Sequence, residues 1–105
     1  MLPQNSISIV NLVNCYNNEA EVLAYAKMLA SHNCHEILML VVNVNSFSKN
    51  NNFENFENAL SNAYNTSMLV TTGNNLGYLN GMIFSYNEFE KKYDLNYVKW
   101  IIMSN

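Results

Sequence analysis

Residues 72–81 read Thr-Gly-Asn-Asn-Leu-Gly-Tyr-Leu-Asn-Gly, and this stretch holds all three glycines of the chain, spaced four residues apart. An apolar run at 68–70 precedes it, and an apolar-periodic segment at 78–89 follows it. Glycine and asparagine tolerate positive φ angles and close backbone approach, so the stretch predicts a sharp turn from a strand into a helix. The first N–H groups of such a helix can bind an anion or a polar ligand edge, although the spacing alone favours glycines that serve only packing.

The composition describes one folded domain, which we take as residues 1–105. Half of the residues are hydrophobic and 12% are charged, which excludes a disordered tail. The net charge is −3, with five lysines and no arginine, and this argues against nucleic acid as a partner because phosphate-backbone binding needs clustered cations. No apolar run has the length of a membrane span and the polar start is not a signal peptide, so the expected location is cytoplasmic.

Outside the glycine turn, strand and helix patterns alternate along the whole chain. Strands are predicted at 7–13, 36–44, 67–71 and 97–103, and helices at about 19–31, 53–64 and 78–92. An asparagine at position 17 or 18 is expected to cap the first helix. Alternation with short links predicts a three-layer α/β/α fold with a four-stranded parallel sheet of order 3-2-1-4. The first two helices should cover one face of the sheet and the third helix the other.

The apolar period also predicts which side chains of the third helix are buried. The inward set of this helix is Leu79, Met82, Ile83, Tyr86 and Phe89. Trp100, at a strand position, is expected in the core rather than stacked on a ligand.

In parallel sheets ligands bind beyond the carboxyl ends of the strands, so the residues at those ends indicate which kind of ligand the fold binds. A dinucleotide-binding fold has a glycine fingerprint after its first strand, and here that turn has no glycine. A phospho-acceptor receiver domain needs an aspartate at a strand end, and the one aspartate, Asp94, falls in a predicted loop.

Four segments around the strand ends share a different pattern, in order and at matching spacing. They are residues 9–19 (Ile-Val-Asn-Leu-Val-Asn-Cys-Tyr-Asn-Asn-Glu), 41–46 (Val-Val-Asn-Val-Asn-Ser), 75–81 (Asn-Leu-Gly-Tyr-Leu-Asn-Gly) and 100–105 (Trp-Ile-Ile-Met-Ser-Asn). Together they resemble the nucleotide-sugar-binding half of the family 2 glycosyltransferases, which have the Rossmann-like GT-A fold, and especially their rhamnosyltransferase-like members.

The resemblance implies a donor site for a nucleoside diphosphate sugar. By it, Tyr16 would stack on the base, Asn43 would accept a hydrogen bond from the base edge, and Ser46, Asn75 and Gly77 would complete the nucleotide-binding set. Asn105 falls on the first position of the family's metal-binding Asp-x-Asp motif, which would hold Mn or Mg in a longer parent enzyme. The family has an aspartate where this chain has Asn43, and that hydrogen bond loses its charge assistance.

The chain has neither the second aspartate of that motif nor the acceptor half, which supplies the general base in inverting members. We therefore expect the truncated donor-binding half of a hexosyl- or rhamnosyltransferase of cell-surface polysaccharide synthesis. It is expected to be inactive alone and to transfer a sugar to an unknown acceptor only as part of its parent enzyme. The alternative is a stand-alone, non-catalytic α/β binding or assembly module.

Two further groups of residues have the residue types for metal binding or for a disulfide. His32, Cys34 and His35 have the residue types of metal ligands, but a surface loop is the favoured interpretation because they fall at the opposite end of the sheet from the site. Cys15 and Cys34 lie at opposite ends of neighbouring strands, so both are expected as free thiols. The fourth strand, 97–103, is an apolar edge, and we expect self-association through it or through the incompletely covered sheet face.

Overall fold

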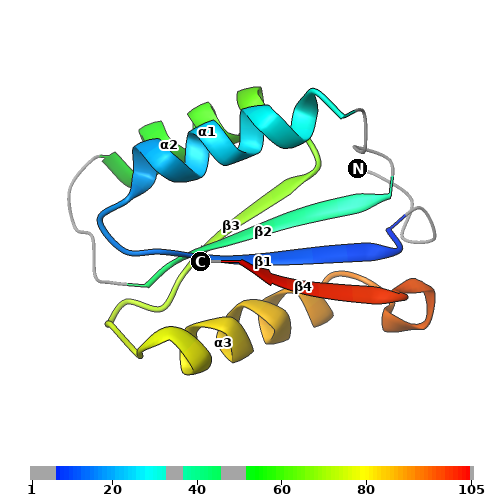
Figure 1. Ribbon diagram of the computed structural model, residues 1–105. Coiled ribbons are helices and arrows are strands. Elements are labelled where there is room, and N and C mark those ends of the chain that lie inside the picture. The colour runs from blue at the N-terminus through cyan, green and yellow to red at the C-terminus, as the bar shows by residue number, and fades with distance from the viewer. Residues whose placement is uncertain (1–6, 33–36, 46–51, 105) are drawn as a thin grey trace.

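The computed structural model describes residues 7–32, 37–45 and 52–104, and it has the predicted α/β architecture. The elements follow in the order β1 (Ile9–Cys15), α1 (Glu19–Ala30), β2 (Leu38–Val44), α2 (Asn52–Ala63), β3 (Ser67–Thr71), α3 (Tyr78–Glu90), a 3₁₀ helix (Leu95–Tyr97) and β4 (Trp100–Ser104). The four strands form one parallel sheet of order β3-β2-β1-β4, with α1 and α2 on one face and α3 on the other (Figure 1). The predicted topology is confirmed.

The apolar strands β1 and β2 occupy the middle of the sheet and supply side chains to both faces. On the face covered by α1 and α2, Val13, Val42 and Leu40 pack with Val22, Ala26, Phe56, Leu60 and Tyr64. On the other face, Val10, Leu12, Met39 and Val41 pack with Met82 and Phe89 of α3. Every residue of β2 is buried, which is why its sequence is almost continuously hydrophobic.

The orientation of α3 differs from the prediction. Met82 and Phe89 are buried as expected, but Leu79 and Ile83 are 63% and 50% exposed, and Gly81 and Ser85 face the sheet instead. The reason is that Gly81, lacking a side chain, lets the first turn of α3 approach two asparagine side chains of the sheet closely. Because Gly81 and Ser85 face the sheet, α3 is rotated about its axis relative to the prediction. Leu79 and Ile83 therefore point toward the side of β4.

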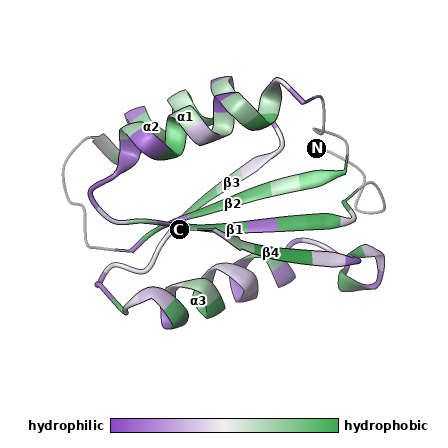
Figure 2. Ribbon diagram, viewed as in Figure 1, coloured by the Kyte–Doolittle hydropathy of each residue, from purple (hydrophilic) through white to green (hydrophobic). Residues whose placement is uncertain are grey.

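The fourth strand starts later than predicted and lies at the edge of the sheet. Residues 95–97 form the 3₁₀ helix rather than strand, and β4 begins at Trp100. Trp100 is 68% exposed, so its assignment to the core was wrong. A central-strand position would have buried it, whereas at this end of the edge strand none of the described helices covers the sheet (Figure 2).

The start of α1 also corrects an expectation about capping. Asn18 occupies the N-cap position but its side chain makes no cap bond to the helix. Its Oδ1 instead accepts a hydrogen bond of 2.8 Å from the backbone N–H of Tyr16, and Asn17 takes a positive φ of 59°. The asparagines therefore shape the turn after β1 rather than cap the helix.

Candidate functional site

The candidate site is the edge of the sheet where all four strands end, which we call the carboxyl rim. Because the strands are parallel, Cys15, Val44, Thr71 and Ser104 lie at this one edge (Figure 1). The turn of residues 72–77 leaves β3 here and enters α3. The sheet order reverses direction between β1 and β4, and such a switch point is where open α/β sheets bind ligands.

Three asparagines at the ends of β1 and β2 hold this turn in place, and we call them the asparagine clamp: Asn14, Asn43 and Asn45. Asn14 Nδ2 donates to the carbonyl of Tyr78 at 2.8 Å. Asn45 Nδ2 donates to the carbonyl of Gly77 at 3.0 Å. Asn45 Oδ1 accepts from the N–H of Leu76, also at 3.0 Å. Side chains on two central strands thereby fix the first residues of α3.

Asn43 is the innermost member of the clamp. Its side chain is fully buried, and Nδ2 lies 3.3 Å from Asn14 Oδ1 and 3.4 Å from the carbonyl oxygen of Gly81. Its Oδ1 has no hydrogen-bond partner among the described residues. Ser85 Oγ donates to the same Gly81 carbonyl at 2.8 Å, so polar groups line the contact between α3 and this end of the sheet.

The clamp leads to a first prediction, that Asn45→Ala destabilises the protein by about 2 kcal/mol. Two part-buried hydrogen bonds are lost, and one of them is the bond that the Leu76 N–H donates to Asn45 Oδ1. Asn75→Ala is the matched control, since it removes one exposed bond, from the Gly77 N–H to Asn75 Oδ1 at 3.0 Å, and should cost under about 1 kcal/mol. Denaturant unfolding measures both, and hydrogen exchange at Leu76 should accelerate only in Asn45→Ala. Equal costs for the two variants would contradict the clamp.

The residues predicted for nucleotide binding fall in three different settings. Tyr16, which is 52% exposed, and Asn75 and Gly77, which are also exposed, lie at the carboxyl rim. Asn43 lies beneath α3 and has no exposed surface. Ser46 lies outside the described residues, as does Asn105, which was predicted as the first position of the metal-binding motif.

The N-terminus of α3 differs from that of α1 in its electrostatics. The first turn of α1 carries Glu19 and Glu21, which neutralise the positive end of its dipole. The first turn of α3 carries no acidic residue, and its N-cap, Gly77, makes no side-chain cap bond. The N–H of Gly81 is the one that bonds back to Gly77, at 3.0 Å, and the three N–H groups before it have no acceptor within the helix. This end of α3 can therefore receive an anion.

The turn that enters α3 is set by the conformation of Gly77. Its φ is +82°, and a Cβ at this position would meet no atom within 4 Å. The glycine is therefore needed for its backbone angle and leaves open space above the helix N-terminus, as the sequence predicted for this stretch.

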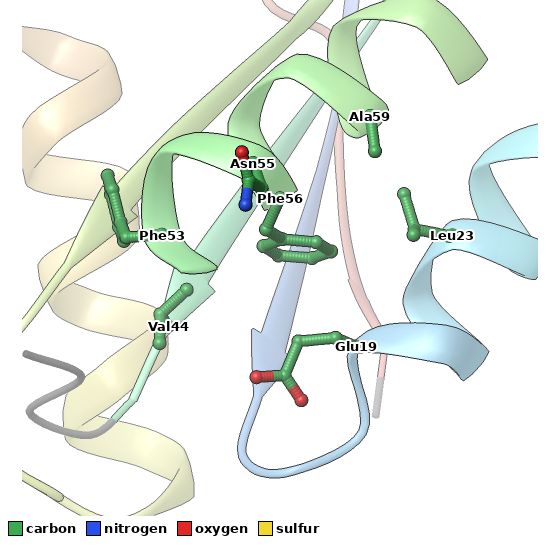
Figure 3. Close-up of a pocket in the computed structure, with 7 residues that line it drawn as sticks. All are labelled: Glu19, Leu23, Val44, Phe53, Asn55, Phe56 and Ala59. Atoms are coloured by element: carbon green, nitrogen blue, oxygen red, sulfur yellow. The ribbon is translucent and has the colours of Figure 1, made fainter. Parts of the chain in front are cut away.

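A pocket of about 460 Å³ opens near the same rim, between the N-terminal ends of α1 and α2. Figure 3 shows its lining of apolar side chains from both helices and the end of β2, with the Glu19 carboxylate at one side: Leu23, Val44, Phe53, Phe56 and Ala59, besides Asn55. Among the described residues predicted to bind the nucleotide, Tyr16, Asn43, Asn75 and Gly77, none lines it. A carboxylate and apolar walls disfavour a diphosphate, so we do not place the site there.

Sequence reasoning missed a polar triangle on the α1 side of β1. Asn11, buried in the middle of β1, donates to the hydroxyl of Tyr25, and Ser104 Oγ donates to Asn11 Oδ1 at 2.9 Å. The Tyr25 and Ser104 oxygens are 3.4 Å apart. The sequence signal that could have indicated this contact is Asn11, an asparagine within an otherwise apolar strand. The triangle joins β1, α1 and β4 near the switch point.

Nucleophilic and metal chemistry gain no support from the described residues. Burial raises the pKa of Cys15 to about 11, with the charge of Glu19 adding to the effect, so the thiol stays protonated at neutral pH. His32 lies at the end of α1 opposite the carboxyl rim, and Cys34 and His35 fall outside the described residues. Within the described ranges no three His, Cys, Asp or Glu side chains gather as a metal site.

Comparison with known proteins adds no relative: no protein family, curated protein or solved structure matches this chain. None of the helices in the described part of the chain has the length and hydrophobicity needed to cross a membrane.

Proposed function

We propose that this chain is the donor-binding part of a GT-A glycosyltransferase of the rhamnosyltransferase-like type and holds a nucleoside diphosphate sugar at the carboxyl rim. The observation that carries the proposal is the pairing of an exposed aromatic ring, Tyr16, with the acid-free, uncapped N-terminus of α3. The two are linked through β1, because Asn14, two residues before Tyr16, bonds to the carbonyl of Tyr78. The four sequence motifs at the strand ends point to the same ligand.

Each part of the rim has a physical task in this proposal. The face of Tyr16 offers a stacking platform for a nucleotide base, which favours any base by about 1–3 kcal/mol. The free N–H groups at the start of α3 and the positive end of its dipole attract the diphosphate. Asn75 holds the N–H of Gly77 and keeps the turn in shape. Asn43 serves the clamp below the ligand, since its side chain has no exposed surface.

The divalent ion that such a parent enzyme would use does not fit the described residues. Mn and Mg prefer carboxylate oxygens, and the described carboxylates near the rim, Glu19, Glu21 and Glu54, belong to the first turns of α1 and α2. We therefore derive no step through a metal and expect no sugar transfer by this chain alone. The sugar and its acceptor belong to the chemistry of the parent enzyme.

A second candidate, a non-catalytic assembly module, is favoured by a separate observation. All four large side chains at the start of β4, Trp100, Ile101, Ile102 and Met103, are exposed. A surface of this kind marks an interface rather than a small-molecule site. Binding of a nucleotide at the rim would distinguish the donor-binding part from a pure assembly module.

The test is a titration of the ¹⁵N-labelled chain with uridine diphosphate. Amide shifts should gather at Tyr16, Asn75, Gly77 and the first turn of α3, and should spare His32. Tyr16→Ala should weaken binding about tenfold, because a stacking contact is worth about 1–3 kcal/mol. Tyr16→Phe should keep most of the affinity, since it retains the ring.

Tyr97→Ala is the matched control for the tyrosine substitution. Tyr97 is exposed to a similar degree but lies in the 3₁₀ helix before β4, at the opposite edge of the sheet. Its replacement should leave the affinity unchanged. Absence of saturable shifts at the rim, or equal losses in Tyr16→Ala and Tyr97→Ala, would remove the donor-binding proposal.

A further inference from the structure

Strand β4 is exposed on both faces and along one edge. Trp100 and Ile102 share the α1 face with Ile9 and Asn11 of β1, while Ile101 and Met103 share the α3 face. A central strand would have all of these side chains covered, as β2 has. The outer edge of β4 has no strand beside it among the described residues, so its peptide groups there are open to pairing.

The α3 face continues this surface into a groove. A hollow of about 220 Å³ runs between α3 and β4. The described residues that line it are all uncharged: Leu12, Leu79, Met82, Ile83, Tyr86, Asn87, Ile101 and Met103. Leu79 and Ile83 were the residues expected to be buried against the sheet, and their rotation toward β4 forms one wall of the groove. The groove and the strand therefore make one apolar patch.

From this surface we infer that β4 pairs with β4 of a second copy of the chain, antiparallel, about a two-fold axis at Ile102. The product is a continuous eight-stranded sheet. The two carboxyl rims then lie on opposite edges of that sheet, so the dimer leaves both rims open and the inference does not depend on the proposed function.

The register follows from the direction of the peptide groups. The N–H of Trp100 donates inward to the carbonyl of Ser8 at 3.1 Å, so Ile102 and Ser104 also face β1, and the N–H and C=O groups of Ile101 and Met103 face outward. Antiparallel pairing about Ile102 sets Ile101 opposite Met103 of the second copy, and both residues then exchange hydrogen bonds. Ile102 meets its own copy as a non-hydrogen-bonded pair, in which side chains lie closest.

The side chains in this register are self-complementary. Ile101 faces Met103 on the α3 side, next to the two grooves, and the Ile102 pair lies on the other side. Residues 100–104 carry no charge, so pairing desolvates no ionised group within the strand. If a partner strand carried charged or polar side chains, those side chains would lie against the apolar patch with no group to pair with.

The area available is of the size that a dimer needs. Six large side chains, Leu79, Ile83, Trp100, Ile101, Ile102 and Met103, are between 42% and 68% exposed. At about 200 Å² for a large side chain they present on the order of 600 Å² per copy, close to the roughly 800 Å² per partner of specific interfaces. An antiparallel pair uses the same patch on both copies and closes on itself, whereas parallel edge pairing would not close.

The test is sedimentation velocity at micromolar concentrations with charge substitutions at the two-fold axis. The unmodified chain should form a dimer that dissociates on dilution. Ile102→Lys should raise the dissociation constant at least about 100-fold, because it sets two like charges opposite each other. Ile102→Glu alone should raise the dissociation constant to a similar extent, for the same reason. Mixing the two variants should restore the dimer, because the lysine of one copy then faces the glutamate of the other.

Met28→Lys is the control, since Met28 is 44% exposed on α1, close to the 42% of Ile102 but away from β4. It should leave association unchanged, and far-ultraviolet circular dichroism should show that each variant folds. A monomer at all concentrations would overturn the inference and leave the patch to another protein or another segment. A dimer that survives Ile102→Lys, or a mixture that stays monomeric, would overturn it as well.

Discussion

Gly81→Ala is expected to lower the free energy of unfolding by about 2 kcal/mol, the size of a typical overpacking cost. Alanine inside a helix normally stabilises by about 0.5–1 kcal/mol relative to glycine, so the expected sign is the reverse of the usual one. A Cβ at position 81 would lie 2.7 Å from Asn14 Oδ1, 3.0 Å from Asn14 Nδ2 and 3.1 Å from Asn43 Nδ2. These amides are held by the clamp bonds to Tyr78 and to each other, so they can move aside only by breaking them.

Denaturant unfolding of Gly81→Ala measures this cost, with Asn80→Ala as the control. Asn80 is the exposed neighbour in the same helix, and its replacement should be neutral or slightly stabilising because alanine is the better helix former. In the double variant Asn14→Ala/Gly81→Ala the clashing amide is absent, so its cost should be smaller than the sum of the single costs. A stabilising Gly81→Ala would show that α3 does not rest on the clamp.

The fold could be predicted from the sequence because its signals are local and agree with one another. Apolar strand patterns alternate with helical patterns along the chain. Because the crossovers between parallel strands are right-handed, few strand orders are possible. The position of β4 at the edge followed from the strand order. The buried face of α3 was predicted wrongly, because the apolar period marks Leu79 and Ile83 as inward, while the contact is decided by two amides from other strands.

The candidate site was predictable to the level of the sheet edge and no further. The rule that parallel strands end together places Tyr16, Asn75 and Gly77 at one rim. It cannot say whether a polar side chain at a strand end faces a ligand or a helix, and Asn43 faces α3. The triangle of Asn11, Tyr25 and Ser104 includes a contact across 93 residues of sequence, which only the tertiary structure reveals.

Asn43→Asp is expected to cost about 3 kcal/mol at pH 7, because it sets a buried carboxylate where an amide donates to two oxygens. Burial beside the Asn14 and Gly81 oxygens raises the pKa of this aspartate above its unfolded value of about 3.9. The protonated acid can donate a hydrogen bond and fits better, so the variant should be closest to the unmodified chain below about pH 4. Its stability should then fall by up to about 1.4 kcal/mol per pH unit as pH rises from there to the raised folded pKa.

Unfolding of this variant between acid and neutral pH, referenced to the unmodified chain at each pH, measures the effect. Asn75→Asp is the control, since an exposed carboxylate at the rim should change stability little at any pH. The same two variants address the base contact that the family resemblance assigns to residue 43. If Asn43→Asp is as stable as the unmodified chain at pH 7 and binds uridine diphosphate more tightly, residue 43 meets the nucleotide and the clamp is misassigned. If it is destabilised as expected and the nucleotide affinity of its folded fraction does not rise, the side chain serves α3, because a carboxylate at the base would have added charge assistance.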